Sequence, residues 1–202
     1  MSAAREMRRL SNQLVQCLQL PACDADLITA IGEAVNRVRG RPVRLYAVPF
    51  PPDVANGVWI DREGHDVIAY EKHADLEHQV VIIGHEIWHM MQGHCGLLTD
   101  HGPMASRALT GDVARAQELV TAICMTDDAR HTADQTMHVQ TSIQFALRAD
   151  GAAVHKEEDA DRFGVRFATA VQAHMEEVRS MAGLEDNLAG RIHIFMAHRF
   201  RR

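Results

Sequence analysis

The spacing of apolar residues along the first part of the chain predicts two short helices. From residue 4 to residue 20, apolar positions recur every three or four residues, as they do on one face of a helix. A second periodic segment follows Asp24, a residue type that caps helices, and runs to Val38 before the residues RGRP. Residues 1–40 are therefore predicted to form an N-terminal helical segment.

The pattern then changes to short apolar runs, which are typical of strands. Residues 43–50 (VRLYAVPF) predict a first strand, and the proline-containing residues PPDVAN predict a loop after it. Residues 57–61 (GVWID) and 65–70 (HDVIAY) predict two more short strands around a turn that contains glycine. Together these runs predict a small sheet.

The next helix is predicted to carry polar residues in the middle of an apolar run. Asp75 can cap its start, and Gly93 offers a stop at its end. Residues 80–95 have the sequence VVIIGHEIWHMMQGHC, so that two histidines and a glutamate lie among apolar neighbours. Because burying polar groups without partners is costly, this trio requires an explanation.

The second half of the chain alternates between loop-like and helical patterns. Glycine and polar residues predict a loop over 97–111, and a helix follows around 113–125. Residues 126–142 are polar and aperiodic, which predicts a mobile loop or lid. Helical spacing returns from His155, with an apolar side formed by Ala160, Phe163, Val165, Phe167 and Val171.

Composition and charge are those of one globular domain. The chain has 202 residues, 47% of them hydrophobic, which is enough for a single domain over residues 1–202 with its own core. The net charge of −6 is scattered along the sequence, which disfavours direct binding to nucleic acid. We find no signal-peptide pattern and no apolar run long enough to cross a membrane, and the four cysteines form no CxxC pair. We therefore expect a cytoplasmic protein with free thiols.

The polar trio in the third helix matches the H-E-x-x-H pattern of zinc-dependent hydrolases. His85 and His89 are four residues apart, so on a helix both rings project from one face and can reach one metal ion. Glu86 would lie beside the coordination position that stays open for water. The alternative is the polar face of an ordinary amphipathic helix, which the apolar neighbours disfavour.

A catalytic zinc ion takes a third protein ligand, and the extended form of the pattern does not supply it here. That form, H-E-x-x-H-x-x-G-x-x-H, requires a glycine and a histidine where this chain has Gln92 and Cys95. Cys95 as a substitute ligand is disfavoured because Gly93 ends the helix before it. The third ligand is therefore expected further along the chain.

The segment EEDADRFG offers that ligand. Glu157 is the first candidate, with Glu158 as the alternative one position away. Asp161 lies four residues after Glu157 on the same helical face, so it could accept a hydrogen bond from a ligand histidine. The competing interpretation is a solvated acidic start of a helix, where carboxylates are also favoured.

The residues HEIWHMMQGH together with EEDADRFG resemble the ImmA/IrrE-type zinc metallopeptidases, whose pattern is H-E-x-x-H with a downstream E-x-E-A-N/D-x-F-A. The residues GRPVRLYAVPFP, GVWI and HDVIAYEK extend this similarity to actinobacterial members labelled as toxin components of toxin–antitoxin-like pairs. The resemblance covers residues 10–94 and 155–169. Two positions depart from the family pattern, with Asp159 in place of glutamate and Gly164 in place of alanine.

This resemblance implies an α+β, zincin-like fold of the gluzincin kind. The fold would consist of N-terminal helices, a small antiparallel sheet, the H-E-x-x-H helix and C-terminal helices, one of which carries Glu157. The resemblance also implies action on a specific regulatory protein, a helix-turn-helix transcriptional regulator. The alternative is a zinc-stabilised protein that sequesters such a DNA-binding regulator without cutting it.

The expected roles follow from zinc chemistry. His85, His89 and Glu157 are the expected ligands of Zn²⁺, which lowers the pKa of a bound water toward about 7 and polarises a carbonyl group. Glu86 is expected to take the proton of that water and pass it to the leaving amine. A different divalent metal would also suit this ligand set, although zinc suits it best.

The oxyanion of the transition state needs a further hydrogen-bond donor. Tyr70 is the first candidate because it ends the strand that precedes the active-site helix and, by resemblance, borders the cleft. His155 and His138 are the other candidates. An ordinary structural role for the Tyr70 hydroxyl is the alternative.

Overall fold

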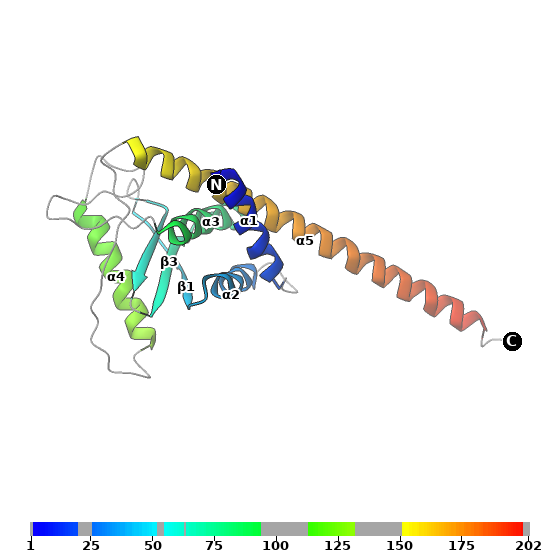
Figure 1. Ribbon diagram of the computed structural model, residues 1–202. Helices are drawn as coiled ribbons and strands as arrows, with labels where there is room; N and C mark the ends of the chain where they lie inside the picture. The colour runs from blue at the N-terminus through cyan, green and yellow to red at the C-terminus, as the bar shows by residue number, and fades with distance from the viewer. Residues whose placement is uncertain are drawn as a thin grey trace.

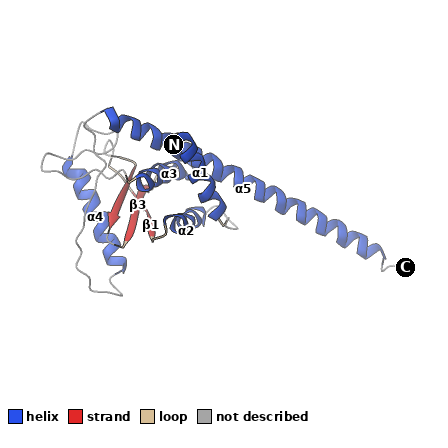
Figure 2. Cartoon of the chain, viewed as in Figure 1, coloured by secondary structure: helices blue, strands red, loops and turns tan. Residues whose placement is uncertain are grey.

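The computed structural model describes residues 2–19, 26–51, 55–62, 64–93, 113–131 and 151–199. It confirms an α+β fold in which helices surround a small sheet (Figures 1 and 2). In chain order the elements are α1 (Ala3–Cys17), α2 (Leu27–Arg39), β1 (Val43–Val48), β2 (Gly57–Arg62), β3 (His65–Glu71), α3 (Leu76–Gln92), α4 (Val113–His131) and α5 (Gly151–Arg199).

The three strands form one sheet in the order β1-β3-β2. The hairpin between β2 and β3 is antiparallel and turns at Gly64, whose φ of 88° lies in the left-handed region. The expected antiparallel sheet is wrong for β1, which pairs with β3 in parallel. The reason is topological: β2 follows β1 in the chain but lies one strand position away from it, and β3 occupies the position between them.

The two faces of the sheet are covered by different helices. Ile68 and Tyr70 of β3 join the larger core with α1, α2, α3 and α5. Val67 and Ala69, which alternate with them, face α4 and a smaller apolar cluster. Figure 1 shows this arrangement, with α4 on one side of the sheet and α2 and α3 on the other.

The boundaries of α3 are those predicted from the sequence. Asp75 occupies the N-cap position, and its carboxylate accepts a hydrogen bond of 2.8 Å from the backbone N–H of His78. Gly93 ends the helix with a φ of 62°. At the start of α2 the cap position is Asp26, whereas the predicted cap, Asp24, lies outside the described residues.

The structure corrects two expectations for the second half of the chain. The predicted loop 126–142 is wrong for residues 126–131, which continue α4 to His131; residues 132–142 lie outside the described residues. On α5, Val165 is exposed, because it lies off the face that buries Ala160, Phe163, Phe167 and Val171. None of the helices within the described ranges is long and apolar enough to cross a membrane.

Candidate metal centre

Two glycines allow α3 and α5 to cross in close contact. A Cβ atom on Gly84 would lie 3.0 Å from the Cα of Gly164. A Cβ atom on Gly164 would lie only 2.6 Å from the carbonyl oxygen of Val81. A glycine at position 164 therefore suits this crossing, since an alanine would push the two helices apart.

The crossing brings acidic residues of α5 to the histidines of α3. Glu157, Asp161 and Gly164 follow one another at intervals of four and three, so they share one face of α5. Since Gly164 packs against the turn of α3 that precedes His85, the two carboxylates face His85 itself. Side chains separated by about 70 positions in the sequence thus meet at one point.

His85, His89 and Glu157 converge to distances that suit a metal ion. The two histidine Nε2 atoms are 3.0 Å apart; that of His85 lies 3.5 Å from Oε2 of Glu157, and that of His89 lies 3.5 Å from Oε1 of the same carboxylate. Ligand atoms bound to a tetrahedral zinc ion at about 2.0–2.1 Å lie about 3.3–3.4 Å from one another. These three donor atoms, all within 4.8 Å of one another, therefore fit three corners of such a tetrahedron.

Asp161 orients the first of these histidines. Its Oδ1 lies 3.0 Å from Nδ1 of His85, a distance at which the ring N–H donates to the carboxylate. A proton on Nδ1 leaves the lone pair of Nε2 directed at the point shared with His89 and Glu157. This carboxylate–histidine pairing is the usual support of a metal-binding imidazole.

Glu86 lies next to the cluster of His85, His89 and Glu157, but its carboxylate is bound by strand β2. The backbone N–H of Trp59 donates a hydrogen bond to the Glu86 carboxylate, and the Trp59 indole N–H is anchored 2.8 Å from Asp66. Gly57 leaves room for this approach, since a Cβ atom there would lie 2.8 Å from Oε1 of Glu86. The edge strand therefore fixes where the carboxylate points.

The centre carries more negative than positive charge. Burial raises the pKa of Glu86 to about 7, and the charge of Glu157 acts in the same direction, against His85 and the Trp59 N–H. Burial lowers the pKa of His85, but Glu157, Glu86 and Asp161 outweigh it and raise that pKa to about 9. Such a site favours the binding of a cation.

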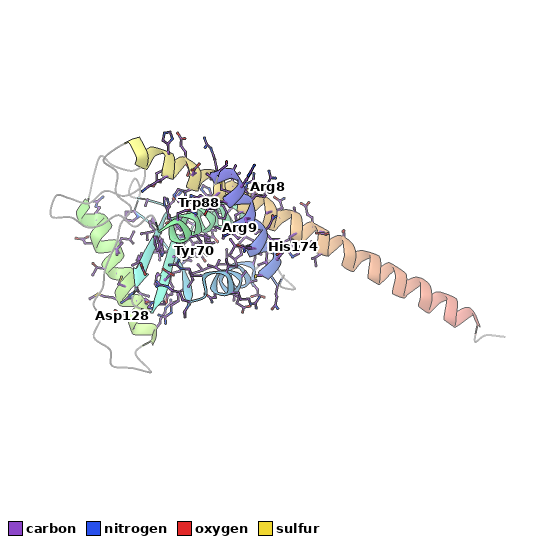
Figure 3. All side chains as sticks on the ribbon, viewed as in Figure 1. Arg8, Arg9, Tyr70, Trp88, Asp128 and His174 are labelled. Carbon is purple, nitrogen blue, oxygen red and sulfur yellow. The ribbon has the colours of Figure 1, made fainter. Side chains whose placement is uncertain are left out.

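Apolar side chains surround the centre on the helix side. Trp88 of α3, labelled in Figure 3, stacks on Phe163 of α5 with ring centroids 5.1 Å apart. Phe163 in turn stacks on Phe167. Ile83 and Ile87 are fully buried one turn apart on α3. The backbones that carry the ligands are therefore held by a packed core rather than by loops.

The structure separates the two glutamate alternatives at the start of α5. Glu158 is half exposed and lies 3.7 Å from Nδ1 of His155 and 3.5 Å from Arg162 on its own helix. It turns away from the histidines of α3, because adjacent helical residues differ in direction by about 100°. Of the two glutamates, Glu157 is the one that lies with His85 and His89.

Two of the candidate oxyanion donors, Tyr70 and His155, do not join His85, His89 and Glu157 in the described cluster. Tyr70 is buried on β3, burial raises its pKa, and it lines a cavity of about 650 Å³ together with α2 and the first turn of α3. His85, His89 and Glu157 are not among the described residues that line this cavity. His155 is largely exposed beside Glu158, and His138 and Cys95 lie outside the described residues.

Sequence reasoning missed the three glycines that make room for this site. Gly84 and Gly164 lie within one or two turns of proposed ligands, and Gly57 begins the strand beside Glu86. A glycine inside an apolar helix next to H-E-x-x-H was the signal that a second backbone approaches there.

Comparisons with known proteins return no match to this chain. No family model, no curated protein and no solved structure matches it.

Proposed function

We propose that this protein is a zinc-dependent endopeptidase of zincin-like architecture, with Zn²⁺ held by His85, His89 and Glu157. The observation that supports this most is the convergence of His85, His89 and Glu157, whose ligand atoms lie within 4.8 Å of one another, next to a separate buried carboxylate, Glu86. Three protein ligands leave a fourth position for water or substrate, whereas structural zinc sites are closed by four. The arrangement therefore suits catalysis better than stabilisation.

The bound zinc ion would supply a water of lowered pKa and would polarise the scissile carbonyl group. Glu86 is held by the Trp59 N–H at the side of the site, where its carboxylate can accept a proton and later release it to the leaving amine. Asp161 is a positioning residue, since it acts on His85 rather than on substrate. Tyr70 remains a candidate for the oxyanion, to be tested by substitution with phenylalanine.

The substrate that the family resemblance favours is a helix-turn-helix transcriptional regulator, cleaved in the cytoplasm. The resemblance rests on HEIWHMMQGH and EEDADRFG, and the second of these segments contains the glutamate that meets the histidines. A protein that only sequesters the regulator would have no use for a buried proton acceptor beside a three-ligand centre.

The test compares three proteins, each co-expressed with a helix-turn-helix regulator encoded next to the gene of this protein, the partner that the resemblance implies. The intact mass of the regulator is then measured, and the zinc content of each purified protein is determined by elemental analysis. The wild type is expected to yield a defined fragment, Glu86→Gln to keep zinc but cut at least about 100-fold more slowly, and His89→Ala to lose both zinc and cleavage.

Glu158→Gln is the matched control, because it removes a carboxylate next to Glu157 without touching the centre. It is expected to bind zinc and cleave like the wild type. If the regulator stays whole with the wild type but co-purifies with it, the protein sequesters the regulator and does not cleave it. If the purified wild type contains no zinc, both proposals are wrong.

A further inference from the structure

The last helix continues well beyond the body of the protein. The first part of α5 packs against α3 and α1, and Met175 is the last of its residues packed against the main core. From there the helix runs out to Arg199, and within the part of the chain that the structure describes no helix or strand lies alongside it (Figure 1). We call residues 176–199 the outer segment.

The outer segment carries an apolar pattern with the period of a coiled coil. Positions that alternate in steps of three and four continue the buried face of Phe167 and Val171 through the half-buried His174 into the outer segment. Val178, the first of these positions beyond the core, is already 38% exposed. The positions that follow are Met181, Glu185, Leu188, Ile192 and Phe195, so that glutamate is the single polar interruption between Val178 and Phe195.

A period of 3.5 residues indicates what kind of partner this face would accept. A helix that packs on a globular core follows its own period of 3.6, whereas a sustained step of three and four keeps one seam facing another helix. The outer segment is about 36 Å long, which is a little over three heptads and enough for a coiled-coil interface. The partner is therefore expected to be a helix with the same repeat.

Charge along the outer segment is divided into two halves of opposite sign. Residues 176–187 contain Glu176, Glu177, Glu185 and Asp186 against one Arg179. Residues 188–199 contain Arg191 and Arg199 and no acidic residue. Two identical segments side by side in the same direction would place like charges together, whereas in opposite directions each acidic half would meet a basic half.

We propose that the outer segment pairs with the outer segment of a second copy of this chain in an antiparallel coiled coil. The apolar seam supplies the buried area, and the divided charge selects both the partner and the direction. Because each body is joined to the acidic end of its outer segment, antiparallel pairing holds the two bodies at opposite ends of the coil. Both metal centres then stay accessible to a protein substrate.

Two adjacent substitutions test whether the apolar positions from Val178 to Phe195, the seam, hold the dimer together. Sedimentation equilibrium of the full chain measures the oligomeric state of each variant. Leu188→Glu places a charge on the seam, and Asn187→Glu places the same charge one residue away from it. The wild type and Asn187→Glu are expected to be dimers, and Leu188→Glu a monomer with an unchanged melting temperature of the body. A monomeric wild type, or equal dissociation of both variants, would overturn the proposal.

The direction is tested by reversing charge in one half and then in both. Arg191→Glu with Arg199→Glu makes both halves acidic, so an antiparallel dimer is expected to dissociate roughly tenfold more readily at low salt. Adding Glu177→Lys and Asp186→Lys restores opposite halves and should restore the dimer. A dimer that is insensitive to the arginine reversals would contradict antiparallel pairing, because a parallel dimer already places like charges together.

Discussion

The two faces of the sheet each bury a carboxylate beside a histidine, but they balance its charge in different ways. On the α4 face, Asp127 lies 2.8 Å from Arg44, 2.9 Å from Arg62 and 2.7 Å from His65, and it accepts a hydrogen bond from the Tyr46 hydroxyl. On the α3 face, the neighbours of Glu86 are His85, a second glutamate and one backbone N–H. The first carboxylate is surrounded by the cations of the protein itself, and the second is not.

The pKa values of the two groups follow this difference. Burial alone would raise the pKa of Asp127, but hydrogen bonds from Arg44, Tyr46 and His65 outweigh it and lower that pKa to about 2. For Glu86 burial prevails, and its pKa rises to about 7. The ion-pair network of Asp127 is balanced by charges of the protein itself, whereas the candidate metal centre has an excess of negative charge that a bound cation would balance.

The largest expected effect is a loss of stability when the charge of Asp127 is removed. Asp127→Asn leaves the guanidinium of Arg62, which is 4% exposed, without its main counter-charge, and is expected to lower the free energy of unfolding by about 3 kcal/mol. Its neighbour Asp128 also pairs with Arg62, but the Asp128 side chain is 40% exposed. Asp128→Asn should therefore lower the free energy of unfolding by less than about 1 kcal/mol.

Urea unfolding and zinc titration of both variants make this measurement. The affinity for zinc is expected to stay at the wild-type value, since α4, which carries Asp127, lies on the opposite face of the sheet from α3. A large loss of zinc binding in Asp127→Asn would mean that the two clusters are coupled and that the comparison fails.

A second prediction concerns the helix crossing that builds the metal centre. Gly164→Ala places a Cβ atom 2.6 Å from the Val81 carbonyl oxygen, and is expected to cost about 2 kcal/mol of stability and to weaken zinc binding. Gly32→Ala in α2 is the control, because its Cβ atom would meet only Leu45 at 3.4 Å. Alanine is the better helix former, so this variant should be neutral or slightly stabilising. Thermal melting and zinc titration distinguish the two, and a tolerant Gly164→Ala would show that the crossing can widen freely.

How far the sequence predicted these two clusters depends on the range of the contacts. The H-E-x-x-H spacing placed His85, Glu86 and His89 because four residues on a helix fix a direction locally. Pairing with Glu157 required a second motif and a family resemblance, since nothing local joins positions so distant. The parallel direction of β1 was missed for the same reason: strand direction leaves no mark in a six-residue pattern.

The Asp127 network shows why the other cluster was not predicted at all. The residues around Asp127 were interpreted as a polar loop because acidic residues in an aperiodic stretch usually face solvent. In the structure they are the counter-charges of Arg62, which is buried in β2. The signal that was missed is Arg62 itself, a charged residue at a strand position that faces the core. A buried arginine requires a carboxylate from another element.

A third prediction addresses the support of the metal ligand. Asp161→Asn keeps a hydrogen-bond acceptor beside Nδ1 of His85 but removes its charge, and is expected to weaken zinc binding about tenfold. Asp159→Asn is the matched control on the same helix, because Asp159 pairs with Arg162 rather than with a ligand. Competition with a zinc-binding dye measures both affinities, and equal affinities would remove Asp161 from the centre.

The smallest expected effect is the pH dependence that the Asp127 network confers. Its folded pKa of about 2 lies below the ordinary value of 3.8, so the unfolded chain binds the proton more readily. The stability it contributes is therefore complete above about pH 5 and is lost as the pH falls through 4 toward 2. Between pH 7 and pH 3 this loss amounts to about 1 kcal/mol. Urea unfolding at both pH values measures the effect. Between pH 7 and pH 3, the free energy of unfolding should fall by about 1 kcal/mol more in the wild type than in Asp127→Asn. Equal decreases would mean that the proton is taken up elsewhere, and that the charge balance on the α4 face does not depend on Asp127.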